Sequence, residues 1–324
     1  PPIRVWGTIG FIVAMWITNL TGNKASANMF YISAIAAISL GIYSFFLPKC
    51  PPQNLISKDS TLTQKLGLDA FKLFGTYKVA LFLLFSMFLG AALQLTNMYG
   101  DTFLSDFSKV PAYENSFVVK YSTIIMSISQ ISETLFILAI PFFLKRFGIK
   151  QVMLISMVAW VLRFGLFAYG DPSGGLWMII LSCIVYGMAF DFFNISGSLF
   201  IETSTDSSIR SSAQGLFMMM TNGFGAILGS AVSGRMIDAF FTKSLTKVSE
   251  VASYYEVNTE HPMLKELLKG NTIKPDGTLT KAIMIQQWEP IWLSFAAYAL
   301  VVAILFAVLF KHKHDPNEIG EISH

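Results

Sequence analysis

The sequence predicts an all-α polytopic membrane protein. Of its 324 residues, 53% are hydrophobic and 13% are charged, whereas a soluble domain carries about 25% charged residues. The apolar residues form continuous runs near the ~20 residues that a helix needs to cross a bilayer. Helix is the expected state because it satisfies its own backbone in lipid, and the strands of a barrel would alternate in polarity.

Eight apolar runs follow one another along the chain. A linker at 48–78 separates the second run from the third, and Pro48, Pro51 and Pro52 at its start are residues that end a helix. Two runs therefore precede the linker and six follow it. The runs are expected at 5–20, 29–47, 79–104, 117–144, 152–169, 176–201, 213–237 and 288–310.

The basic residues predict the orientation. They gather in alternate short connections, which the positive-inside rule places in the cytoplasm together with the C-terminal tail at 311–324. The long segment 242–287 then falls outside the cytoplasm by parity. The residues concerned are Lys49, Lys58, Lys65, Lys72 and Lys78 in the linker, Lys145, Arg146 and Lys150 in the next loop, and Lys311 and Lys313 in the tail.

Several apolar runs contain polar side chains. Asp191 lies in the middle of the run at 176–201, where insertion of a carboxylate costs roughly 2.5–3.5 kcal/mol, so a polar interior and a function are expected. Three other runs carry polar pairs three or four residues apart, on one helix face. These pairs are Arg4 with Thr8, Gln94 with Asn97, and Gln130 with Glu133. Together the four spans predict a bundle around a polar cavity.

Three strings of sequence are more specific than the hydropathy. They are Arg4-Val-Trp-Gly-Thr-Ile-Gly10, Tyr186-Gly-Met-Ala-Phe-Asp-Phe-Phe-Asn-Ile-Ser-Gly-Ser198 and Arg210-Ser-Ser-Ala-Gln-Gly-Leu-Phe-Met-Met-Met-Thr-Asn222. These strings closely resemble the bacterial nucleoside/proton symporter family of the major facilitator superfamily. The resemblance implies proton-coupled import of a nucleoside, such as uridine, across the inner membrane by alternating access.

The resemblance also implies a domain organisation of twelve helices in two bundles. Eight of the twelve are expected here, with residues 1–47 as the last two helices of the N-terminal bundle and its first four absent. Residues 48–78 are the cytoplasmic linker, and residues 79–310 are the C-terminal six-helix bundle. The segment 242–287 is longer than the family's usual connection, and the loop at 145–150 lacks the usual Asp and first Gly of the superfamily's switch loop.

Carried over position by position, the resemblance implies a set of site residues. The substrate-binding residues are Arg4, Thr8, Phe11, Gln94, Asn97, Gln130, Glu133, Tyr186 and Phe190. Asp191 is implied as the proton-coupling residue, with Glu133 as the second candidate and Arg4 as the expected countercharge.

The chemistry of these residues suits a neutral nucleoside. Amides donate to and accept from the base, a carboxylate accepts from ribose hydroxyls, and aromatic faces stack on the base. The same inventory suits a sugar, so a proton-coupled sugar or oligosaccharide porter is an alternative, as is a non-transporting membrane receptor on the same fold. Purely structural roles also stay open: amide pairs join membrane helices, and an arginine near a span end extends to the interface.

The sequence carries no motif for an enzyme, a metal site or a cofactor. It has no HExxH, no metal-spaced Cys/His cluster and no Gly-rich phosphate loop, so an ion gradient is the expected source of energy. The net charge of +3 is small and scattered, which argues against nucleic acid as a partner. Cys50 and Cys183 predict no disulfide. We expect a monomer in the lipid bilayer.

Overall fold

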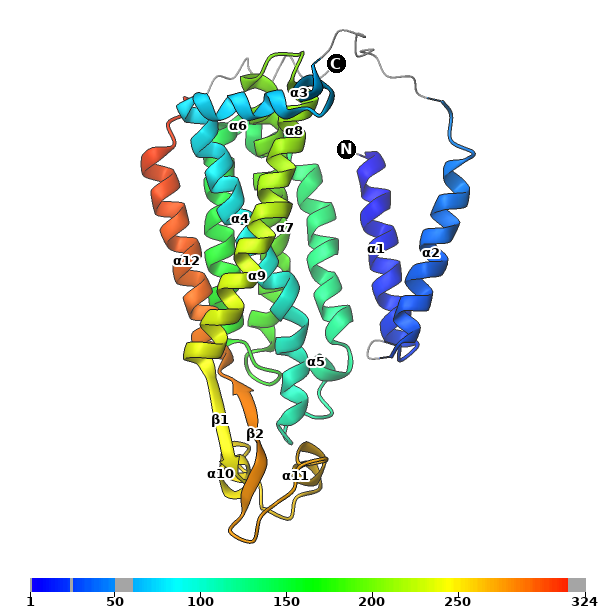
Figure 1. Ribbon diagram of the computed structural model, residues 1–324, viewed down its shortest axis with the longest axis vertical. Helices are drawn as coiled ribbons and strands as arrows, with labels where there is room; N and C mark the ends of the chain where they lie inside the picture. The colour runs from blue at the N-terminus through cyan, green and yellow to red at the C-terminus, as the bar shows by residue number, and fades with distance from the viewer. Residues whose placement is uncertain (1, 24–25, 50–60, 314–324) are drawn as a thin grey trace.

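The computed structural model describes residues 2–23, 26–49 and 61–313. Its body is a bundle of long, roughly parallel helices (Figure 1). The long helices are α1 (Pro2–Leu20), α2 (Asn28–Ser44), α4 (Tyr77–Asp106), α6 (Ser122–Tyr169), α7 (Leu176–Ser204), α8 (Arg210–Met218), α9 (Gly225–Met236) and α12 (Trp288–Leu309). Short helical pieces connect or extend them: α3 (Leu62–Lys65), η1 (Leu68–Gly75), η2 (Phe107–Lys109), α5 (Phe117–Lys120), η3 (Met219–Phe224) and η4 (Ile237–Phe241).

The helix α6 contains two spans. A straight helix of its 48 residues would be about 72 Å long, more than twice the ~30 Å hydrocarbon core. The chain bends at Gly148, whose φ of 77° and ψ of 169° form a conformation that is essentially restricted to glycine. Arg163 Nη1 lies 3.5 Å from Ser129 Oγ although 34 residues separate them. The two halves of α6 therefore run side by side.

We expect Gly148→Ala to destabilise the bundle by about 1–3 kcal/mol, because a Cβ disfavours this backbone conformation. The measurement is the midpoint of thermal unfolding in detergent. Gly165→Ala is the matched control in the same helix, since a Cβ there would meet nothing within 4 Å and alanine favours a helix interior. Equal losses for the two variants would show that the Gly148 conformation is not required.

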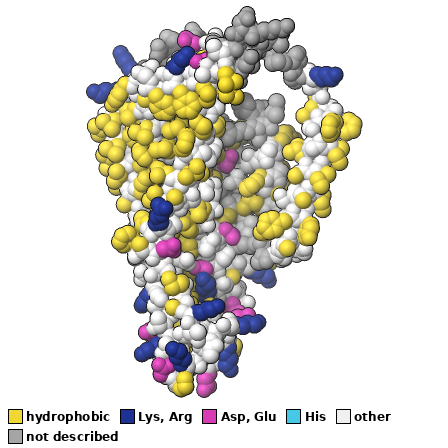
Figure 2. Space-filling view, viewed as in Figure 1, with side chains coloured by type: hydrophobic (Ala, Val, Ile, Leu, Met, Phe, Trp, Pro, Cys, Tyr) yellow, Lys and Arg dark blue, Asp and Glu magenta, His cyan; other side chains and the backbone are white. Residues whose placement is uncertain are grey.

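The prediction of an all-α polytopic membrane protein is confirmed. Among the described residues, five helical stretches are long and apolar enough to cross a membrane, and α1 and α2 are shorter apolar helices. With the halves of α6 counted separately, each predicted apolar run coincides with a helix. Helices α8 and α9 belong to one continuous helix, Arg210–Phe241, which includes the π-helical segments η3 and η4. Hydrophobic side chains cover the visible face of the bundle (Figure 2).

Aromatic side chains fill the core between α4, α6 and α12. Phe103 of α4 packs against Trp292 of α12 and Phe167 of α6, with ring centroids 5.5 Å apart in both pairs. Trp288 Nε1 also donates to Asp106 Oδ2 over 3.0 Å, which ties α12 to the end of α4. This packing holds together the helices that carry the polar residues of the interior.

Helices α1 and α2 bury far less surface. Trp16 Nε1 of α1 donates to Ser127 Oγ of α6 over 2.8 Å, so α1 lies against the first half of α6. Among the described residues of α2, none is buried. Figure 1 shows α2 on the far side of α1 from the main bundle.

The segment after η4 folds into a separate small unit. Strands β1 (Thr242–Lys247) and β2 (Thr278–Gln286) form an antiparallel ribbon that places Leu245 opposite Ile283. Helices α10 (Val248–Tyr254) and α11 (Pro262–Leu267) complete a small core of Leu245, Val251, Ala252, Tyr255, Leu264, Leu268, Leu279 and Ile285. The sequence had indicated only a long loop here, because the pairing joins segments that are distant in sequence. The unit projects from the end of the bundle opposite α3 (Figure 1).

Glu250 fixes the start of α10. Its Oε2 accepts from the backbone N–H of Thr246 at 2.8 Å and of Lys247 at 3.1 Å. These two bonds hold the pKa of Glu250 below its ordinary range, and the bond from Thr246 contributes most. Since the folded pKa is the lower one, the stabilisation is complete above the unfolded pKa and is lost as the pH falls through the folded pKa.

We therefore expect hydrogen exchange of the Thr246 and Lys247 amides to lose protection as the pH falls from about 7 to about 3. In Glu250→Gln the protection should be weaker and should not change over this range. Glu266→Gln, which alters an exposed carboxylate of α11, is the control and should behave as the parent. If protection of the Thr246 and Lys247 amides in the parent protein did not change with pH, Glu250 would not be the group that stabilises the start of α10.

Candidate functional site

The site is built where α7 lies directly against the first half of α6. A Cβ on Gly187 would come within 2.6 Å of the carbonyl carbon of Ser132, so only glycine allows this approach. The Ser132 hydroxyl donates to the carbonyl oxygen of Ile184 and fixes the two helices in register. This contact brings Glu133, the neighbour of Ser132, beside the part of α7 that carries Tyr186.

Tyr186 is the centre of the predicted polar cluster. Its phenol lies near the side chains of Gln130, Glu133 and Asp191. Asp191 is 0% exposed and Glu133 is 7% exposed. Two carboxylates buried in membrane-spanning helices, next to a phenol and an amide, form an arrangement that can hold a polar ligand and a proton.

Aromatic rings form a second part of the site. Phe190 lies one helical turn after Tyr186, and the two rings are stacked at 6.1 Å with planes 10° apart. Trp160 of α6 meets the edge of Tyr186 at 5.9 Å and 89°, which fixes the tilt of that ring. Parallel rings beside an amide and a carboxylate suit a flat, hydrogen-bonding heterocycle.

The structure thus assembles five of the predicted residues on α6 and α7. The others lie on α1 and α4, two helices that pack against α6. Gln94 is half-buried, and its Cβ lies 3.2 Å from where a Cβ on Gly229 of α9 would stand. Asn97 is exposed, Thr8 is buried and Phe11 is 56% exposed. The side chain of Arg4 lies outside the described residues.

Arg163 was not among the predicted site residues, although its side chain is 0% exposed in the second half of α6. Its Nη1 donates to the carbonyl oxygen of Ser182 over 2.7 Å, and its Nε lies 3.4 Å from Thr96 Oγ1. The predicted countercharge for the buried carboxylates was Arg4. The sequence does indicate Arg163, because it is a charged residue within the apolar run at 152–169, and the same observation predicted a function for Asp191.

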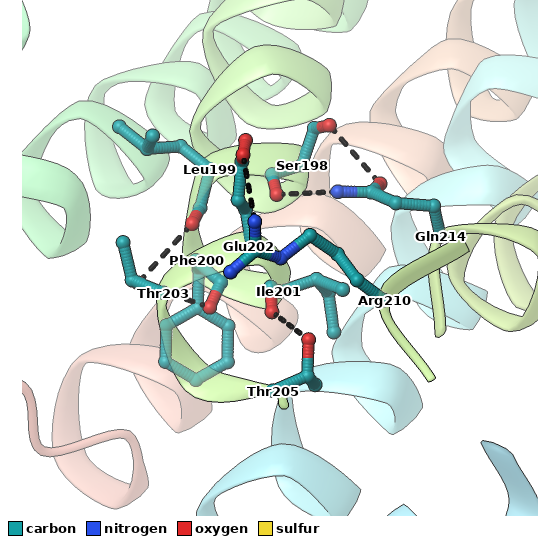
Figure 3. Close-up of polar contacts among 9 residues, drawn as sticks. All are labelled: Ser198, Leu199, Phe200, Ile201, Glu202, Thr203, Thr205, Arg210 and Gln214. Atoms are coloured by element: carbon teal, nitrogen blue, oxygen red, sulfur yellow. Dashed lines mark hydrogen bonds and ion pairs between the residues drawn. The ribbon is translucent and has the colours of Figure 1, made fainter. Parts of the chain in front are cut away.

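Two of the three sequence strings that carry the resemblance, 186–198 and 210–222, contact each other near the C-terminal end of α7. The Gln214 side chain of α8 donates through Nε2 to the Ser198 carbonyl oxygen at 2.7 Å and accepts from Ser198 Oγ at 3.0 Å (Figure 3). Arg210 pairs with Glu202 at 3.6 Å in the same view (Figure 3). These contacts fix the C-terminal part of the helix that carries Tyr186, Phe190 and Asp191.

A bundle of membrane-spanning helices with carboxylates, amides and stacked rings in its interior is the architecture of a polytopic transporter. The model of the nucleoside H⁺ symporter family matches residues 1–315. The chain belongs to this family, so it is a multi-pass bacterial membrane permease of the major facilitator superfamily and not an enzyme.

Individual relatives agree with this assignment. The chain is 48% identical to nucleoside permease NupG of Escherichia coli (strain K12), over 100% of this chain and 68% of that protein. It is 50% identical to a xanthosine permease of Escherichia coli (strain K12), over 98% and 67% of the two chains. A crystal structure of nucleoside transporter NupG superimposes with a TM-score of 0.72 at 48% identity, covering 97% of this chain and 67% of that one.

Proposed function

We propose that this protein imports nucleosides with protons across the inner membrane by alternating access, and that the cluster around Tyr186 is its nucleoside site. The observation that supports the site is the gathering of two buried carboxylates, Glu133 and Asp191, near the Tyr186 ring, which stacks on Phe190. Nucleoside/proton symport is the activity of the family to which the chain belongs.

Each group then has a role that its chemistry allows. Gln130 donates to and accepts from the nucleoside, and Glu133 accepts from ribose hydroxyls. The stacked pair of Tyr186 and Phe190 provides the face for the base. Asp191, which is fully buried, carries the proton. Arg4, Thr8, Phe11, Gln94 and Asn97 complete the cavity from α1 and α4.

We propose further that the working unit is a monomer with twelve membrane helices. Residues 79–310 form one bundle, residues 1–47 belong to the other, and residues 48–78 link them in the cytoplasm. The sparse burial of α1 and α2 supports this division, because α2 has no buried side chain among its described residues. The β1–β2 unit then lies outside the cytoplasm, and the C-terminus lies inside.

The test is uptake of labelled uridine by cells that express the complete transporter, in competition with other nucleosides and with sugars. Saturable uptake that a proton gradient drives, and that nucleosides but not sugars compete, is the expected result. Competition by sugars alone would favour the sugar porter. Uridine binding without accumulation in vesicles would favour the receptor.

A further inference from the structure

Arg163 is a buried cation that lies next to the proposed nucleoside site. Its guanidinium lies between two aromatic rings, 4.5 Å from the ring centroid of Tyr186 and 4.9 Å from that of Phe167. Neutral acceptors on three elements surround it: Thr96 on α4, Ser129 on α6 and the Ser182 carbonyl on α7. The guanidinium therefore contacts the face of the Tyr186 ring within the buried interior.

The energetics argue against a purely structural role. Arginine remains charged in proteins, and a cation without exposed surface loses its hydration. Its Nη2 makes no hydrogen bond of standard geometry within the described residues. An apolar side chain of similar volume is often as stable or more stable at such a position. A charge retained at this cost indicates that the charge itself is used.

The titratable groups around the guanidinium lead to the proposed site. Cys183 and Tyr186 of α7 face Arg163 directly. Tyr186 in turn lies within electrostatic range of Glu133 on α6 and Asp191 on α7. Its phenol also lies near Gln130. The Tyr186 ring therefore contacts the buried cation and also lies near the proposed substrate and proton groups.

We propose that Arg163 is a positioning residue for nucleoside binding and proton coupling, acting through Tyr186. The guanidinium holds the ring by a cation–π contact, which is strongest where both partners are desolvated, and so keeps the phenol beside Gln130 and the two carboxylates. Its positive charge favours the ionised state of the carboxylates that share the cluster. This inference rests on the proposed function, because it assigns Tyr186 to the nucleoside site.

The experiment compares Arg163→Met, Arg163→Lys, Tyr186→Phe and the double variant Arg163→Met/Tyr186→Phe in the complete transporter. Uridine affinity is measured by calorimetry, and the pH midpoint of uridine uptake is measured in vesicles. Arg163→Met should weaken uridine binding about tenfold and move the midpoint to higher pH by about one unit. Arg163→Lys keeps the charge but not the flat guanidinium, so it should restore the midpoint more fully than the affinity.

Coupling through Tyr186 predicts that the effects do not add. In the Tyr186→Phe background, which lacks the phenol, Arg163→Met should change affinity by much less than tenfold. Arg146→Met, at an exposed position of the same helix, is the control and should change neither readout. If Arg163→Met does not fold, Arg163→Lys decides the question by its affinity at an unchanged unfolding midpoint.

An Arg163→Met variant that folds and keeps both its affinity and its pH midpoint would overturn the inference. Full additivity with Tyr186→Phe would overturn it as well, and so would parental affinity in Arg163→Lys if that variant decides the question. A parent protein that neither binds nor accumulates uridine would instead refute the proposed function. The two failures are therefore distinguishable.

Discussion

Replacement of Asp191 with asparagine is expected to uncouple transport from the proton gradient. The variant should still exchange labelled uridine for unlabelled uridine across the membrane, but it should no longer accumulate uridine when a pH gradient is imposed. Vesicles that contain the complete transporter allow both measurements on one preparation. We expect accumulation of uridine against its concentration gradient to be lost completely.

The reason is the position of this carboxylate. Asp191 is fully buried on α7 and in electrostatic contact with Tyr186. Burial favours the protonated acid and a neighbouring cation favours the anion, so a residue subject to both influences can load a proton on one side and release it on the other. Asparagine has nearly the same shape and still forms hydrogen bonds, but it cannot carry a proton.

A matched control separates this effect from a general loss of carboxylate charge. Asp206→Asn changes an exposed aspartate between α7 and α8 and should leave both exchange and accumulation intact. If Asp191→Asn still concentrates uridine at normal yield, Asp191 is not the coupling residue. Glu133 then becomes the first candidate, since both carboxylates lie in range of Tyr186 and titrations of interacting sites are shared.

The membrane helices could be predicted because lipid imposes one requirement on every span. A continuous apolar run of sufficient length must be a helix there, so the runs at 79–104 and 288–310 coincide with α4 and α12. The two halves of α6 were predicted as separate apolar runs, at 117–144 and 152–169, but the residue at which the chain bends was not predicted. Gly148 adopts its φ of 77° because the two halves pack side by side, which is a tertiary effect.

The β1–β2 unit shows where sequence patterns give too little information. Strand β1, Thr-Lys-Ser-Leu-Thr-Lys, is mostly polar and buries only Leu245. Its partner strand begins at Thr278, after two short helices. Pairing of such distant segments depends on the common core that they form with α10 and α11, and no local periodicity encodes it.

The site was predicted in part for a related reason. Polar side chains within apolar runs indicated Gln130, Glu133 and Asp191, and the resemblance added Tyr186 and Phe190. The structure places these residues together on α6 and α7. Arg163 was not predicted, because it forms no polar pair within its apolar run and belongs to none of the strings that carried the resemblance. Its role depends on contacts with Thr96, Ser129 and Ser182, which are adjacent only after folding.

Gln130→Ala and Glu133→Gln are expected to weaken nucleoside binding most among the amide and carboxylate substitutions. Gln130 lies near the Tyr186 phenol, so its truncation removes an amide that the proposed site offers to the substrate. Glu133 is almost fully buried, and its replacement by an amide removes an acceptor for ribose hydroxyls. Each loss should cost about 1–3 kcal/mol, or roughly 5-fold to 150-fold in dissociation constant.

Gln287→Ala is the matched control for these two variants. Gln287 is an exposed amide directly before α12, and its hydrogen bonds to Phe241 and from Ile291 are made by its backbone. Truncation of its side chain should therefore leave uridine affinity unchanged. Calorimetric titration of the complete transporter with uridine measures all three variants against the parent. Equal affinities across the three would assign Gln130 and Glu133 to helix packing. A selective loss at Glu133 alone would keep the carboxylate as the substrate contact and leave Gln130 with only the orientation of Tyr186.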